Sequence, residues 1–278
     1  MILRFPRLAG AVLLFAAQSL FAQQTKVPEE IDVGKSPRVY GSHFSRYGKT
    51  PAKVIRYENQ FIRFVFPAGG KLTEADPHGL YSYFSLAGDF EVSAEFEIRT
   101  LTAPETGYGV SIGIALETTT PFGNVQITRG FMGDKPPVAG YIFTQAIPHE
   151  SDTKYEVTMF PSTAKRGRMA LKREKDELIF LAADKPADSL SELGRIKFTK
   201  EKITKMRFVA DRGGDNNTFD NSIGSLKVRA DEITGGLPKE ELAEGPNWFR
   251  IACYVGLLGG IGFFIQRWRR RKRERDEE

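Results

Sequence analysis

The stretch Gly88–Ile98, GDFEVSAEFEI, decides the fold class of this chain. Its apolar side chains occupy every second position, and glutamates and a serine fill the positions between them; the apolar set is Phe90, Val92, Ala94, Phe96 and Ile98. Successive side chains of a β-strand point to opposite faces. The pattern therefore predicts a strand with one face in a hydrophobic core and the other in solvent.

Similar short runs recur along the chain, with turn residues between them. The runs expected as strands are Phe61–Phe66, Tyr81–Leu86, Phe90–Arg99, Tyr108–Glu117, Asn124–Thr128, Gly140–Gln145, Tyr155–Phe160, Arg168–Arg173, Glu177–Ala182, Arg195–Phe198, Lys205–Ala210 and Ile223–Arg229. Arg168–Ala182 is predicted to be a hairpin with the charged turn Glu174–Asp176. Because no amphipathic helix is evident, the chain is expected to be all-β, an antiparallel jelly-roll β-sandwich.

The β-sandwich is expected to span residues 56–233. Residues 23–55 form a polar lead-in that prolines punctuate, with one edge strand expected around Arg38–Tyr40. Residues 234–247 contain two adjacent glycines and two prolines, a composition typical of a flexible linker.

Several motifs in Tyr57–Glu232 together resemble a known superfamily. They are Phe61–Phe64 (FIRF), Gly88–Val92 (GDFEV), Gly107–Gly109 (GYG), Leu171–Arg173 (LKR) and Ser225–Arg229 (SLKVR). In this order they resemble the concanavalin A-like lectin/glucanase superfamily, with its laminin-G-like jelly roll. Within it, the chain is most similar to a bacterial exported domain family without an assigned function. The resemblance implies a fold more than an activity.

The N-terminus has the layout of a secretory signal peptide over residues 1–22. Arg4 and Arg7 precede the apolar run Leu8–Ala22, and cleavage is expected after Ala22. An uncleaved signal anchor is the alternative, and either form would export the middle of the chain.

Residues 248–268 are predicted to form a transmembrane helix. Trp248 and Trp268 bracket it at the positions of the two membrane interfaces, and the basic tail 269–278 begins with Arg269, Arg270 and Arg271. The prediction is a single-pass protein of the bacterial cytoplasmic membrane, with the lipid bilayer as a partner, its large domain outside and its C-terminus in the cytoplasm. A buried helix and a cleaved sorting signal are the alternatives, because the uninterrupted apolar run Ile251–Ile265 is short.

Ala252, Gly256 and Gly260 recur at four-residue spacing in this predicted helix. Small residues at that spacing let two membrane helices approach closely, so a homodimer is possible through this face. The single cysteine, Cys253, also lies in the segment, so the exported domain must rely on its core rather than on disulfides.

The formal net charge of +5 comes largely from the two termini. The exported body carries nearly equal numbers of basic and acidic residues, which predicts no nucleic-acid partner. Within the body, Asp211–Asn221 gathers carboxylates, amides and glycines before the final strand. Hard oxygen ligands of this kind suit a structural Ca²⁺, with Asp215 and Asp220 as the candidate ligands, although the same residue types also build ordinary turns.

Two patterns are candidates for a catalytic site. Gly109–Gly113 matches G-x-S-x-G, but β-like sequence continues after it, whereas a nucleophile elbow needs a strand that turns into a helix. Glu95 and Glu97 could share a strand face as a glycanase pair, but the central aspartate and third acid of the superfamily's motif are missing. The glycines are interpreted as positions of close backbone approach, and the glutamates as a solvated face. No catalytic residue is assigned.

Aromatic side chains are the remaining candidates for contacts with sugars. The candidates are Tyr81, Tyr83, Tyr108, Phe122, Phe131 and Tyr141, although a Phe or Tyr in a sandwich of this size more often belongs to the core. The sequence thus favours a membrane-anchored extracytoplasmic binding module for carbohydrate or another envelope component, rather than an enzyme. A glycoside hydrolase or lyase of the superfamily is the alternative function.

Overall fold

The computed structural model describes residues 29–32, 37–48, 51–66, 78–103, 109–118, 124–132, 137–149, 152–213 and 218–235. By its internal contacts the chain divides into residues 1–236 and residues 237–278, and every described residue belongs to the first unit.

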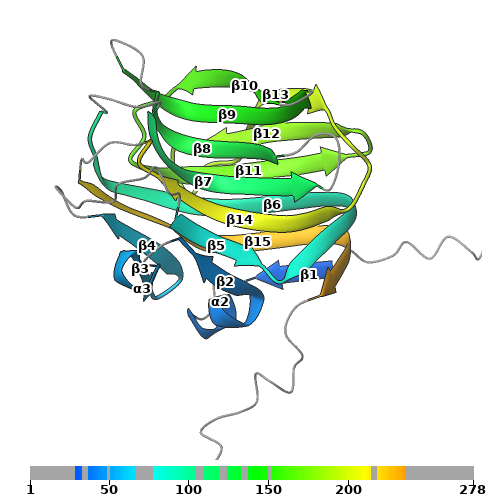
Figure 1. Cartoon of the computed structure of the whole chain (residues 1–278), viewed down its shortest axis with the longest axis horizontal. Coiled ribbons are helices and arrows are strands. Elements are labelled where there is room, and N and C mark those ends of the chain that lie inside the picture. The colour runs from blue at the N-terminus through cyan, green and yellow to red at the C-terminus, as the bar shows by residue number, and fades with distance from the viewer. Residues whose placement is uncertain are drawn as a thin grey trace, which may run out of the picture. The chain divides into compact units, whose positions relative to one another are not determined.

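Two antiparallel sheets make up this unit (Figure 1). The front sheet consists, in spatial order, of β10 (Asp152–Pro161), β9 (Val138–His149), β8 (Asn124–Met132), β7 (Gly109–Thr118), β14 (Ile203–Asp211), β5 (His78–Ser82) and β2 (Phe44–Tyr47). The back sheet consists of β13 (Ser191–Lys197), β12 (Glu177–Ala183), β11 (Arg166–Glu174), β6 (Phe84–Leu101), β15 (Phe219–Gly235), β4 (Phe61–Phe66) and β3 (Ile55–Glu58), with β1 (Glu29–Asp32) beside β15. The sheets join where Ile203 of β14 pairs with Leu86 of β6. The predicted all-β antiparallel sandwich is confirmed.

Alternating side chains from both sheets form one core. In β6, Phe90, Val92, Ala94 and Phe96 are buried, and Glu91, Ser93, Glu95 and Glu97 on the other face are half-buried. From the front sheet, β7 contributes Ile112, Ile114 and Leu116 to the same cluster. The alternation that predicted the strand therefore also separates core from surface, because one face of each sheet packs against the other sheet.

The predicted hairpin over Arg168–Ala182 is present as β11 and β12. Arg173 pairs with Leu178, and Glu174 with Glu177, so Lys175 and Asp176 form the turn. Lys175 has φ 57°, the left-handed conformation that a tight hairpin turn requires.

The edge strand expected around Arg38–Tyr40 is wrong, because these residues lie in the helix α2 (Pro37–His43). The Tyr40 ring is fully buried against Phe44, Tyr57 and Phe208, and its hydroxyl donates to the carbonyl of Gln60, 2.9 Å away. Together with α3 (Pro51–Val54), this helix brings residues of the polar lead-in into the core. A helical turn is favoured here because it buries this aromatic side chain while its hydroxyl keeps a partner.

The expected strand Tyr81–Leu86 is divided between the two sheets. His78–Ser82 is β5 of the front sheet, whereas Phe84–Leu86 begins β6 and pairs with the end of β15. The change of sheet occurs at Tyr83, whose backbone N–H donates to His43 O at 2.8 Å. A continuous run of apolar residues does not reveal such a crossing, since both halves are strands.

Candidate glycan-binding groove

An open groove of about 680 Å³ lies on the outer face of the front sheet. Its lining comes from β7, β8, β9, β10 and β14: Gly109, Val110, Ser111, Asn124, Gln126, Thr128, Phe131, Met132, Ile142, Thr144, Tyr155, Val157, Arg207, Val209 and Asp211. Amides, hydroxyls and charged groups are interspersed with apolar side chains. This mixture suits a ligand that has both hydroxyl groups and apolar faces.

The sheet register arranges the groove floor in rows. Arg207, Ala115, Gln126, Thr144 and Val157 are successive partners across β14, β7, β8, β9 and β10. Directly paired residues point to the same face, and neighbouring strands lie about 4.8 Å apart. The row therefore presents the cation of Arg207, the amide of Gln126 and the hydroxyl of Thr144 along one line. The small side chain of Ala115 leaves space between Arg207 and Gln126.

Asn124 lies one row away, beside Ala146 and Glu117. Its side-chain oxygen Oδ1 is buried and has no hydrogen-bond partner among the described residues. A buried acceptor left without a donor costs about 1–3 kcal/mol, so a rotation of the Asn124 side chain that turns this oxygen toward a ligand hydroxyl in the groove would recover that energy.

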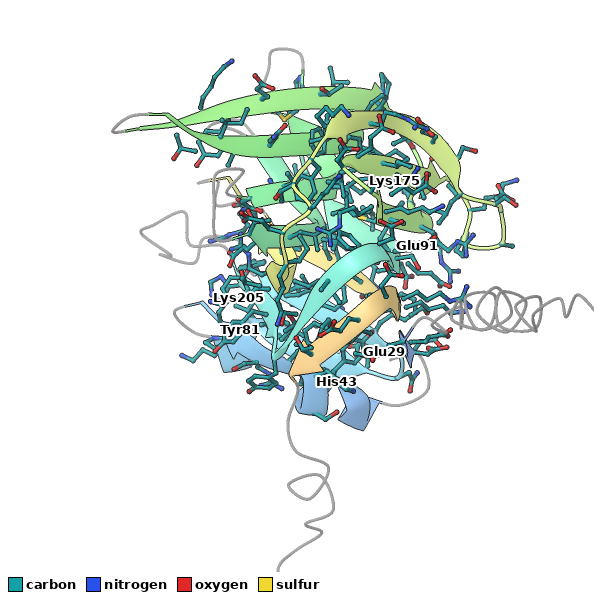
Figure 2. The ribbon with its side chains drawn as sticks, turned by 90° about the vertical axis from the view of Figure 1, so that its right-hand side faces the viewer. Glu29, His43, Tyr81, Glu91, Lys175 and Lys205 are labelled. Carbon is teal, nitrogen blue, oxygen red and sulfur yellow. The ribbon has the colours of Figure 1, made fainter. Side chains whose placement is uncertain are left out.

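A tyrosine cluster stands beside the groove, where β14 meets β5 and β2. The rings of Tyr47 and Tyr81 are stacked with centroids 6.3 Å apart, and Tyr83 meets Tyr81 edge-on at the same distance. Lys205 Nζ lies 5.7 Å from the centre of the Tyr81 ring, and Figure 2 shows these two residues together on the front-sheet side. The cluster places aromatic faces next to the polar floor of the groove.

Arg207 connects this tyrosine cluster to the groove. Its Nε lies 2.9 Å from Glu117 Oε1, and its guanidinium lies 5.9 Å from the Tyr47 ring centre. Burial raises the pKa of Tyr47 to about 12, and the Tyr47 hydroxyl donates to Phe208 O at 3.3 Å. The phenol is therefore neutral and held in place at ordinary pH.

At the opposite end of the groove, Tyr155 and Val157 on β10 are 65% and 45% exposed. Exposed aromatic rings can stack on sugar rings, and the groove has tyrosines near both ends. Tyr47, Tyr155 and the polar row were not identified from the sequence, because alternating polar residues in a strand look the same on a solvated face and on a binding face.

Of the six candidate aromatic residues in the sequence, Tyr81 and Tyr83 lie in the tyrosine cluster and Phe131 lines the groove. Tyr141 belongs to the core, where its hydroxyl donates to Ala183 O at 3.1 Å. Tyr108 and Phe122 lie outside the described residues.

Ser111 of the G-x-S-x-G match lies inside β7, which continues to Thr118 without turning into a helix. A Cβ at Gly109 would come within 2.5 Å of Phe131 O, and one at Gly113 would collide with Ile127 O. Both glycines therefore permit close approach of β8, as interpreted from the sequence, and the geometry of a nucleophile elbow is not formed.

Glu95 and Glu97 lie on the outer face of the back sheet, on the other side of the sandwich from the groove. Glu95 is opposite Arg168 of β11, and Glu97 contacts Arg99 at 3.5 Å. Glu91, four residues before Glu95 and on the same strand face, appears in Figure 2 on the side opposite Tyr81 and Lys205. These two glutamates therefore belong to a charged outer surface.

On the groove side, the described carboxylates are Glu117 and Asp211, whose positions on the paired strands β7 and β14 are six residues apart. At about 3.3 Å per residue this is roughly 20 Å. Retaining glycosidases need about 5–5.5 Å between their carboxylates and inverting ones about 6.5–9.5 Å. Glu117 and Asp211 are therefore too far apart to act together as such a pair.

Asp220 is held by an arginine in this structure. Arg63 donates from Nε and Nη2 to its two carboxylate oxygens, at 2.7 and 2.6 Å. Asp215 lies outside the described residues, among which there is no cluster of three or more His, Cys, Asp or Glu side chains that could hold a metal. The Ca²⁺ site stays a prediction.

The predicted membrane segments also lie outside the described residues. These include residues 1–22, the anchor residues Trp248, Trp268, Arg269, Arg270 and Arg271, and the helix-packing residues Ala252, Gly256 and Gly260. Within the part of the chain that is described, neither helix has the length and hydrophobicity needed to cross a bilayer.

The two packed sheets and the groove define a protein of the concanavalin A-like lectin and glucanase fold. The chain belongs to the family described as "Protein of unknown function (DUF1583) C domain", which matches residues 38–244. A comparison with curated proteins finds no match.

Solved structures of this fold share little sequence with the chain. An immunostimulatory antigen and pseudo β-1,3-glucanase of Mycobacterium tuberculosis has a TM-score of 0.50 at 10% identity, over 76% of this chain and 99% of that one. A legume lectin-like domain from Entamoeba histolytica gives 0.49 at 11%, over 74% and 96%, and a β-glucanase of Bacillus licheniformis gives 0.47 at 9%, over 74% and 99%. At this level of identity the likeness shows the fold alone.

Proposed function

We propose that this protein is a carbohydrate-binding module and that its ligand lies in the groove of the front sheet. The observation that carries the proposal is the buried Asn124 Oδ1 without a described partner, beside the aligned side chains of Gln126 and Thr144. Sugars offer hydroxyl donors and acceptors at short intervals, and their apolar ring faces stack on aromatic side chains. The exposed Tyr155 at one end of the groove and the tyrosine cluster at the other supply such side chains.

A glycan array with the full-length protein in detergent tests this proposal, followed by titration calorimetry on each positive glycan. The double variant Asn124→Ala/Gln126→Ala removes two hydrogen-bonding groups from the groove. Each hydrogen bond contributes about 1 kcal/mol, so the Kd should rise roughly 10- to 30-fold.

The matched control is Glu95→Gln/Glu97→Gln, which changes two side chains on the opposite face of the sandwich and should leave the Kd unchanged. A blank array, or equal binding by wild type and the groove variant, would contradict the proposal. Release of reducing ends from a bound glycan would instead favour the hydrolase alternative.

We further propose that the module is displayed outside the cytoplasmic membrane on a single C-terminal helix. The support is the sequence: a signal-peptide layout at residues 1–22, and an apolar segment at 248–268 bracketed by tryptophans and followed by arginines. Mass spectrometry of the protein purified from membranes should give a chain that begins at Gln23 and ends at Glu278. Recovery in the soluble fraction, or loss of the C-terminal arginines, would contradict this topology.

A further inference from the structure

β10 is an edge strand of the front sheet. Among the described residues it pairs with β9 alone, and the other long side of the strand carries no described neighbour. Five consecutive residues, 154–158, are exposed, and Tyr155 and Val157 are two of the four large hydrophobic residues found exposed in the described part of the chain.

An exposed edge of this length is a template for another strand, and proteins usually interrupt such edges with proline, bulges or charges. β10 has no proline before Pro161 at its end, and its pairing with β9 runs through ten residues without a shift in register. It does carry one lysine, Lys154. However, Glu156 lies on the same face of the strand and binds it, with Nζ 2.9 Å from Oε1.

This order of charges is self-complementary when two copies of β10 run antiparallel. Paired side chains in such a sheet share a face, so the two-fold axis must pass through a residue. With the axis at Tyr155, Lys154 of each copy lies opposite Glu156 of the other, and Thr153 lies opposite Val157. An axis at Lys154 or Glu156 would instead place two like charges directly opposite each other, which is unfavourable.

Axes at the other positions of the strand are less favourable. An axis at Thr158 or Met159 would leave Lys154 without a partner in β10, and an axis at Asp152, Phe160 or Pro161 would pair three residues at most. An axis at Thr153 would pair only residues 152–154, because the strand begins at Asp152. An axis at Val157 would place Lys154 opposite Phe160 and Glu156 opposite Thr158, so neither charge would gain an opposite partner in the other copy. The Tyr155 register pairs seven residues and satisfies both charges.

We propose that β10 is the interface with a second copy of this chain, which continues the front sheet across a two-fold axis at Tyr155. The interface does not depend on the identity of the ligand. Because Tyr155 also lines the groove, the two grooves would meet at this axis and face the same side of the extended sheet.

Cysteine cross-linking in the full-length chain tests the register. In a Cys253→Ser background, Tyr155→Cys places two cysteines directly opposite each other, at a Cα separation of about 4.5–5.5 Å, which a disulfide can bridge. Thr153→Cys or Val157→Cys alone should give no more disulfide-linked dimer than Lys227→Cys does. Lys227, an exposed position on the back sheet, sets the background yield. A mixture of the Thr153→Cys and Val157→Cys chains should form a disulfide between the two different chains, because Thr153 lies opposite Val157 in this register. Both chains of this mixed dimer retain Tyr155.

Charge reversal tests the pairing itself. Lys154→Glu, added to the mixed pair of Thr153→Cys and Val157→Cys chains, places like charges opposite each other and should lower the dimer yield about 10-fold. The double swap Lys154→Glu/Glu156→Lys should restore it. Circular dichroism melting of each variant checks that the fold is intact.

Cross-linking by Val157→Cys alone, equal yield at Lys227→Cys, or no effect of Lys154→Glu would overturn the proposal. None of these outcomes depends on glycan binding, so this interface and the proposed function can fail separately.

Discussion

Arg207 of β14 and Glu117 of β7 form a diagonal ion pair beside the groove, with Nε 2.9 Å from Oε1. Their side chains are 20% and 30% exposed, so solvent only partly screens the interaction. The pair holds a guanidinium where the polar row meets the tyrosine cluster.

This pair predicts different effects on binding and on stability. Arg207→Met should weaken glycan binding roughly 10- to 150-fold, because a hydrogen bond from a charged donor contributes about 1.5–3 kcal/mol. A double-mutant cycle of Arg207→Met with Glu117→Gln, followed by urea denaturation, should give a coupling of only about 0.5–1 kcal/mol in unfolding free energy. Glycan affinity unchanged by Arg207→Met would exclude this residue from the site.

The ion pair of Asp220 with Arg63 predicts a loss of stability in acid. The hydrogen bonds from Arg63 lower the pKa of Asp220 below that of an unfolded aspartate, about 3.9. The pair's contribution, about 1–2 kcal/mol, should be fully present above pH 4 and be lost as the pH falls through the lower folded pKa. Urea midpoints of wild type and Asp220→Asn should therefore differ at pH 7 and converge in acid.

Asp220→Asn also tests whether Asp220 serves as the ion-pair partner of Arg63 or as a ligand of the predicted Ca²⁺. If Arg63 is its functional partner, the difference between wild type and Asp220→Asn should be the same in calcium and in chelator. A melting temperature that rises with Ca²⁺ in wild type, and loses that response in both Asp215→Ala and Asp220→Asn, would establish the calcium site instead.

Buried tyrosines predict a loss of stability in alkali. Burial raises the pKa of Tyr47 to about 12, and burial raises the pKa of Tyr40 and of Tyr141 further. Each contribution is present below the unfolded pKa of about 10 and is lost as the pH rises through the folded pKa. The unfolding free energy of the wild type should thus fall between pH 10 and 12. In Tyr47→Phe this fall should be smaller by about 1–3 kcal/mol. Identical pH profiles from urea melts would contradict this.

The contacts of Arg173 indicate that the motif Leu171–Arg173 (LKR) has a structural role. Its guanidinium is buried, lies 4.7 Å from the Phe90 ring centre, and donates to the carbonyls of Gly88, Thr199 and Glu201. Arg173→Met would leave these acceptors without a donor and should destabilise the protein by about 2–4 kcal/mol in urea denaturation. Lys172→Met, at the half-buried neighbouring position, should cost less than about 1 kcal/mol; equal effects would argue against this role.

Sequence patterns correctly predicted the elements that depend only on neighbouring residues. The alternation in Gly88–Ile98 depends only on the opposite directions of successive side chains, and the turn between Arg173 and Leu178 only on a few charged residues. Both are present as predicted. Arg38–Tyr40 was mispredicted because its helix is stabilised by rings from β2, β3 and β14, which no local window contains.

The sequence by itself determined that the chain is an antiparallel β-sandwich, because strand periodicity and turn residues act over a few neighbouring positions. Only the tertiary structure decided where a ligand could bind and which charges meet. Strand register places Gln126 and Thr144 in one polar row with Arg207. Asp220 forms its ion pair with Arg63, which lies 157 residues away in the sequence. The polar face of a strand is the same in sequence whether it meets water, an arginine or a sugar, so its role depends on which strands lie beside it.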